Sequence, residues 1–220
     1  MRPAGRPAAL RRILTVPAPD FPLFPLGLVA LPGELIPLHI FEERYKAMMA
    51  HCQASGSEFG IVWLADDGLH EIGCAVLIEQ VLEELEDGRL NILTRGTRPF
   101  RVIERQGHLS YPAGIVEFVD DREEEPDPAL TEGARAAYAD LVRRATDRDP
   151  TADELAAMNS YDMAATVDFG VDAKQGLLDR RSENARLKLV TRLFRAASKR
   201  LDFVDRAQAR AKSNGKVRFG

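Results

Sequence analysis

Five prolines within or just before an apolar run near the start of this chain restrict what that run can form. The run covers residues 21–45 and reads FPLFPLGLVALPGELIPLHIFEERY, with prolines at positions 19, 22, 25, 32 and 37. Proline fixes φ and lacks a backbone donor, so it suits strand edges, bulges and turns but disrupts a helix interior. The run is therefore too broken to span a membrane as a helix. It predicts short strands with a turn at residues 32–33.

A helix is expected directly after this run. The apolar residues that recur there at helical spacing are Tyr45, Met48, Met49 and Cys52. This pattern predicts a helix over roughly residues 42–53. Two acidic residues, Glu42 and Glu43, stand at its start, where the helix dipole favours negative charge.

Several short segments rich in β-forming residues follow. They cover residues 58–65, 70–85, 90–94, 100–105 and 115–119. The leucine spacing of residues 70–85 also suits a helix, but the Asp87-Gly88 turn requires a partner strand before it, so a strand is expected there. Short strands at intervals of about ten residues are typical of a small barrel or sandwich.

The composition changes after an acidic loop at residues 120–127. No proline follows Pro150, and the chain becomes rich in alanine, leucine and arginine. Helix starts are predicted at Asp127-Pro128, at capping boxes over residues 151–154 and 172–175, and at Ser182. The last helix carries an apolar stripe of Leu187, Val190, Phe194, Ala197 and Leu201. The expected fold class is α+β, with a β-rich domain first and then a helical bundle that ends in a long helix.

Four regions are therefore expected along the chain. They are a flexible extension over residues 1–19, a β-rich domain over 20–126, a helical bundle over 127–202 and a basic, disordered tail over 203–220. The first fourteen residues contain four arginines and no acid. This composition leaves an organelle presequence open beside a frayed extension, whereas the prolines at 17 and 19 stand where a secretory signal would be apolar.

The sequence lacks the common catalytic motifs. It contains no GxSxG serine, and Gly215-Lys216 lacks the upstream glycine and the following hydroxyl residue of a P-loop. The four histidines are scattered and Cys52 and Cys74 form no CxxC pair, so no metal and no cofactor are expected. A formal net charge of −4 gives no general attraction to nucleic acid or acidic lipid. Two cysteines without a disulfide framework suit a reducing cytoplasm.

Binding is the remaining kind of function, and the start of the first helix is the candidate site. Its charged and aromatic residues are Glu42, Glu43, Arg44 and Tyr45. We expect them to form the rim of a hydrophobic groove for extended or unfolded chain, lined by Phe24, Leu26, Leu38 and Phe41. The same pattern also suits a plain helix start whose acids match the dipole, with the four apolar residues in the core.

The phrase PLHIFEERY at residues 37–45 resembles the Lon protease N-terminal domain family. Further matching phrases occur in the same order, namely EFGIV (58–62), HEIGCA (70–75), DGRLNIL (87–93), GTRPFRV (96–102), KQGLL (174–178) and RLKL (186–189). The resemblance covers residues 21–197, nearly the whole chain. It implies a PUA-like pseudo-barrel followed by a helical bundle. It also implies a role in recognising protein substrates, with residues 42–44 at the contact site.

The resemblance further implies a free-standing, non-enzymatic binding protein, because the ATPase and Ser-Lys protease modules that follow this domain in the full-length protease are missing from this sequence. Unfolded or degron-like protein segments are the expected ligands. Lon protease or a chaperone is the candidate partner, and self-association through the last helix stays open. The alternative is RNA binding by the basic tail, through Arg206, Arg210, Lys212 and Arg218. A third hypothesis is an enzyme whose site joins His39 or His70 to distant acids.

Overall fold

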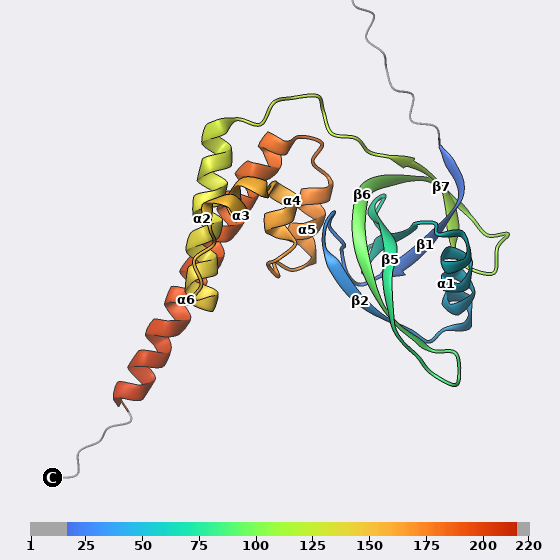
Figure 1. Cartoon of the computed structure of the whole chain (residues 1–220), viewed down its shortest axis with the longest axis horizontal. Coiled ribbons are helices and arrows are strands. Elements are labelled where there is room, and N and C mark those ends of the chain that lie inside the picture. Colours follow the sequence, from blue (N-terminus) through green and yellow to red (C-terminus); the bar gives the residue numbers. More distant parts are fainter. Residues whose placement is uncertain (1–16, 215–220) are drawn as a thin grey trace, which may run out of the picture.

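The chain folds into a β-rich domain and a helical domain that pack side by side (Figure 1). The computed structural model describes residues 17–214. The predicted α+β order, with strands first and helices after them, is confirmed. The first strand begins at Ala18, inside the expected flexible extension, and residues 1–16 of that extension lie outside the described residues.

Among the described residues, seven strands form one sheet that closes on itself. They are β1 (Ala18–Leu26), β2 (Leu35–Ile40), β3 (Phe59–Ala65), β4 (Gly68–Leu69), β5 (Ile72–Glu84), β6 (Leu90–Gln106) and β7 (Ala113–Phe118). Their order is β1-β7-β6-β5-β3-β4, and β2 attaches to β6. β1 closes the sheet into a pseudo-barrel, because it pairs antiparallel with β7 along one edge and parallel with β3 along the other.

β6 is one long strand where the sequence predicted two, at residues 90–94 and 100–105. That prediction was wrong because Gly96 and Pro99 resemble a break in a strand. The pairing tolerates both residues, since the register of β5 on β6 shifts beside them, between Ala75 and Val76. Gly96 allows a close approach of two backbones here, because a Cβ atom at this position would lie 2.0 Å from the carbonyl oxygen of Leu31.

Helix α1 (Glu43–Ser55) confirms the predicted helix and its buried face. The four apolar residues that predicted it are all buried, and they are Tyr45, Met48, Met49 and Cys52. Gly56 ends the helix in the left-handed region, with φ of 64°. The core that α1 joins does not stop at the barrel, because the same contiguous cluster contains Phe59 of β3 and Phe194 of the helical domain.

The helical domain contains five helices within the described residues. They are α2 (Pro128–Thr146), α3 (Ala152–Ala157), α4 (Ser160–Ala164), α5 (Val171–Leu178) and α6 (Glu183–Asn214). Three of the predicted caps are present. The carboxylate of Asp127 accepts from the first turn of α2, Thr151 forms a capping box with Glu154, and the hydroxyl of Ser182 accepts from the backbone of α6.

Two expectations about helix ends were wrong. The capping box expected at residues 172–175 does not form, since α5 begins at Val171 with Gly170 in the cap position and no side-chain cap there. Helix α6 continues to Asn214, although a disordered tail was expected from residue 203. Residues 203–214 contain no glycine or proline and include alanine, arginine, lysine and glutamine, which favour helix. Residues 215–220 lie outside the described residues.

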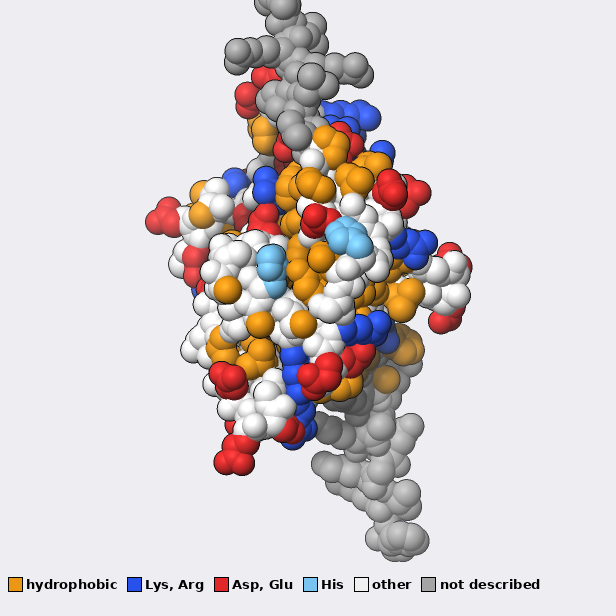
Figure 2. All heavy atoms as spheres, turned by 90° about the vertical axis from the view of Figure 1, so that its right-hand side faces the viewer, with side chains coloured by type: hydrophobic (Ala, Val, Ile, Leu, Met, Phe, Trp, Pro, Cys, Tyr) orange, Lys and Arg blue, Asp and Glu red, His pale blue; other side chains and the backbone are white. Residues whose placement is uncertain are grey.

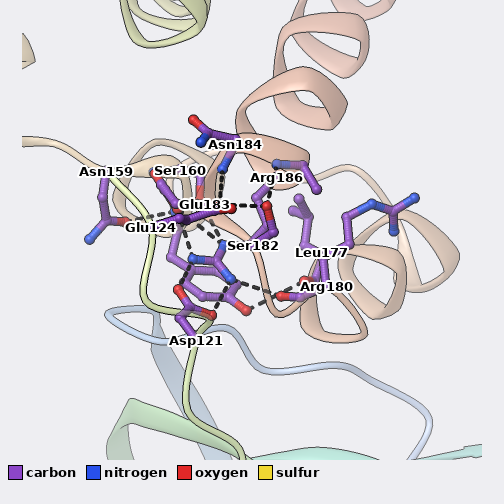
Figure 3. Close-up of polar contacts among 12 residues, drawn as sticks. Asp121, Glu124, Asn159, Ser160, Leu177, Arg180, Ser182, Glu183, Asn184 and Arg186 are labelled. Atoms are coloured by element: carbon purple, nitrogen blue, oxygen red, sulfur yellow. Dashed lines mark hydrogen bonds and ion pairs between the residues drawn. The ribbon is translucent and has the colours of Figure 1, made fainter. Parts of the chain in front are cut away.

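A buried arginine ties the acidic loop to the helical domain (Figure 3). Arg186 is 2% exposed, and its guanidinium donates to both carboxylate oxygens of Asp121, to Glu183 at 2.8 Å and to the carbonyl of Arg180 at 2.8 Å. Its Nε also donates to the hydroxyl of Ser160 at 3.0 Å. Burial alone would lower the pKa of Arg186, and the carboxylates, Asp121 above all, hold that pKa above its usual value. The loop is thereby fastened to α6, and through Ser160 to the start of α4.

A second set of contacts joins α5 to the barrel. Lys174 forms an ion pair with Glu34, and both side chains are largely buried. The amide nitrogen of Gln175 donates to the carbonyl of Ile72 at 3.1 Å. Together with the shared core, these contacts hold the two domains in one arrangement.

We expect Gly96→Ala to destabilise the protein by about 2–4 kcal/mol, because the new Cβ would force β6 away from the Leu31 carbonyl. Gly107→Ala is the matched control, since a Cβ atom there meets nothing within 4 Å. Urea unfolding followed by far-UV circular dichroism measures both. Equal midpoints for the two variants would contradict this account of the strand crossing.

Arg186→Met should destabilise the protein by about 3 kcal/mol, because it removes the cation that pairs with Glu183 and Asp121 and the donor to the buried hydroxyl of Ser160. The control is Arg144→Met, which removes an exposed arginine that pairs with Asp140 and Asp202 and should cost much less. Chemical unfolding gives both values. An equal loss of unfolding free energy in the two variants would show that the burial of Arg186 does not increase its contribution to stability.

Candidate functional site

An open groove lies at one end of the barrel, where several strands finish near the start of α1. Its volume is about 490 Å³. Its lining comes from six segments and comprises Leu23, Phe24, Pro25, Leu26, His39, Ile40, Phe41, Glu42, Arg44, Tyr45, Leu64, Leu69, Arg105, Gln106, Pro112 and Ala113. We call this the barrel groove. Figure 2 views the end of the molecule that carries α1, where hydrophobic side chains gather in the middle of the face and charged side chains surround them.

The floor of the barrel groove is rigid and its edge is exposed. Phe24 and Tyr45 are both buried, and their ring centroids lie 4.2 Å apart. At the edge, Phe41 is 59% exposed and Leu64 is 52% exposed. A large apolar side chain that remains this exposed beside an apolar hollow is typical of a binding surface.

Six of the eight predicted site residues line this groove. They are Phe24, Leu26, Phe41, Glu42, Arg44 and Tyr45. The other two point elsewhere. Leu38 is buried under a separate hollow formed with Leu82 of β5, and the exposed carboxylate of Glu43 pairs with Lys46.

The residues of the opposite wall were not predicted. Leu64 lies on β3 and Leu69 on β4, whereas Arg105 lies near the end of β6 and Pro112 in the connection to β7. These residues lie far from α1 in the sequence, and only closure of the barrel brings them to it. One local signal existed, since Leu64 stands next to a polar turn, where an apolar residue is expected to be exposed.

Two charged residues at the rim pair with each other. The carboxylate of Glu42 accepts from Arg44 at 2.8 Å, with both side chains about half exposed. The guanidinium of Arg44 also lies over the ring of Tyr45, 4.5 Å from its centroid. Burial raises the pKa of the Tyr45 hydroxyl, which Arg44 opposes and Glu42 reinforces. On this side of the rim, Glu42 and Arg44 therefore neutralise each other above an apolar floor.

The lining of the barrel groove is mostly apolar. The described lining residues include no serine, threonine, cysteine or lysine that could act as a nucleophile. Within residues 17–214, no cluster of His, Cys, Asp and Glu side chains could hold a metal ion. The thiols of Cys52 and Cys74 are buried outside the groove, and burial raises the pKa of both. No helix in the described part of the chain is long and apolar enough to cross a membrane.

Comparison with known families agrees with this fold. The model of the ATP-dependent protease La (LON) substrate-binding domain matches residues 20–196, which includes both the barrel and most of the helical domain. This chain belongs to the Lon substrate-binding domain family. The resemblance seen in the sequence phrases is thereby confirmed.

Two solved structures show the same fold. A Lon N-terminal domain protein from Xanthomonas campestris is 29% identical, with a TM-score of 0.59 over 77% of this chain and 95% of that chain. The N-terminal domain of Mycobacterium avium complex Lon protease has a TM-score of 0.62 at 19% identity, over 80% of this chain and 97% of that one. The Lon-type fold thus accounts for both domains of the chain.

The raised pKa of Tyr45 predicts a loss of stability at alkaline pH. A tyrosine whose folded pKa exceeds its usual 10.0 stabilises the fold fully below about pH 10, and that contribution disappears as the pH rises through the folded pKa. Tyr45→Phe should therefore lose less stability than the parent protein between about pH 9 and pH 11. Urea unfolding across this range tests it, and parallel stability curves for the two proteins would refute it.

Proposed function

We propose that this protein recognises substrate polypeptides by holding unfolded or degron-like segments in the barrel groove. The observation that carries the proposal is the open apolar groove, bounded by the exposed side chains of Phe41 and Leu64. Membership of a substrate-binding domain family supports it.

The dimensions of the groove suit an extended segment with a few apolar side chains. A volume of about 490 Å³ is typical of sites that bury a short peptide or a small molecule. Folded proteins keep their apolar side chains inside, so a groove of this kind selects segments that have lost their fold. Glu42 and Arg44 neutralise each other at the entrance, and Arg105 on the opposite wall adds one positive charge.

In this proposal the protein acts by binding and carries out no catalysis of its own. Its setting is a reducing cytoplasm, which is supported by the two buried free cysteines. Lon protease or a chaperone is the proposed recipient of the bound segment.

Leu64→Asp should weaken binding of an unfolded, carboxymethylated model protein by about tenfold, because it places a charge at the edge of the apolar groove. Leu82→Asp is the matched control. Both leucines lie on strands and are 52% exposed, but Leu82 lies outside the groove. Fluorescence anisotropy of the labelled model protein measures the affinities.

The same model protein in its native, folded form should not bind. Equal loss of binding in the Leu64 and Leu82 variants would mean that general surface hydrophobicity causes the binding. Unchanged binding in the Leu64 variant would exclude the barrel groove as the site.

A further inference from the structure

One face of α6 carries a row of cations that have no ion-pair partner among the described residues. The row consists of Lys188, Arg192, Arg195, Lys199 and Arg206. Intervals of four, three, four and seven residues place them along one side of a helix with 3.6 residues per turn. All five are exposed, and within the described part of the chain none of them has an ion-pair partner. We call this set the α6 cation row.

Some other arginines of the helical domain are paired. Arg143 pairs with Asp149, Arg148 pairs with Glu154, and Arg186 is held by Asp121. Asp202 lies between the last two members of the row, but its carboxylate is engaged by Arg144 of α2. The cation row therefore keeps its positive charge without a paired carboxylate among the described residues.

A shallow groove runs beside the row, between α2 and α6. Its volume is about 520 Å³, and it is lined by Ala129, Leu130, Gly133, Lys188, Thr191, Arg192 and Arg195. The wall supplied by α2 is small and apolar. Gly133 leaves a notch in it, since a Cβ atom at that position would meet nothing within 4 Å. This surface can therefore offer a ligand ionic contacts along the α6 wall and apolar contacts along the α2 wall.

The positive strip has a defined length. From Lys188 to Arg206 it extends about 27 Å, at 1.5 Å per residue. Its upstream end borders the acidic loop, because Glu124 accepts hydrogen bonds from Ser182 and Asn184 at the start of α6. A negatively charged ligand that extended past Lys188 toward the start of α6 would be repelled by the carboxylates of the acidic loop.

We propose that this surface docks an acidic amphipathic helix of a partner protein. Acidic side chains spaced three and four residues apart would pair with the α6 cation row, and apolar side chains of the same helix would enter the notch at Gly133. Nucleic acid fits less well. It carries no apolar side chain for the notch, the described lining of this groove offers no aromatic residue for base stacking, and a long polyanion would run into the acidic loop.

The test measures binding of a synthetic helix to the full chain by fluorescence anisotropy. The probe is a labelled peptide of about 18 residues, matched to the length of the strip, with glutamates at heptad spacing beside a row of leucine and alanine. We expect Arg195→Glu to weaken its binding on the order of tenfold. Arg200→Glu makes the same charge change on the same helix, but Arg200 faces the opposite groove, and binding should change less than about twofold.

A second variant separates docking from charge attraction. Gly133→Met fills the notch without changing any charge and should weaken binding several-fold, whereas Leu64→Asp at the barrel groove should leave it unchanged. A scrambled peptide of the same composition should bind more weakly than the probe. Equal effects of Arg195→Glu and Arg200→Glu, or equal binding of the scrambled peptide, would overturn the proposal. So would tighter binding of single-stranded RNA or of phosphatidylserine vesicles that Arg195→Glu abolishes.

Discussion

The double pairing of β1 is the constraint on which the barrel and its groove depend. This strand hydrogen-bonds with β7 on one side and with β3 on the other. It thereby joins two strands that would otherwise be open edges of the sheet. The groove lies where these strands end, so its walls exist only when the sheet is closed. Phe24 shows the link, because it belongs to β1, packs on Tyr45 of α1 and lies under the groove.

Local patterns predicted much of this structure, and distant contacts account for what they missed. Apolar spacing identified α1 and its buried face, and caps located the starts of α2, α3 and α6. The near wall of the groove was predicted from residues 24–45 alone. Leu64 and Arg105 on the far wall could not be predicted, because no nearby residue indicates that β1 pairs with both β3 and β7. The end of α6 was missed because a lack of apolar residues was taken as disorder, although the residue types there favour helix.

The two domains form one body, which fixes the relation between the two proposed surfaces. Their common core, the ion pair of Lys174 with Glu34 and the contacts of Arg186 leave little freedom between them. The barrel groove and the α6 cation row lie on different domains of this body. Ligands bound at both would be held at a set separation, so binding of the first would raise the effective concentration of the second if the two belong to one partner.

Helices α2 and α6 start side by side and run in the same direction. At their beginnings the backbone of Asp127 donates to Asn184, and near the end of α2 Arg144 pairs with Asp202 (Figure 1). Their macrodipoles therefore add instead of cancelling, and two positive helix ends meet at one place. The acidic loop covers that place, with Asp127 capping α2 and Glu124 accepting from the first turn of α6. Its carboxylates thus act as a fixed counter-charge for two parallel dipoles, so the segment between the domains contributes to their electrostatic balance as well as to their connection.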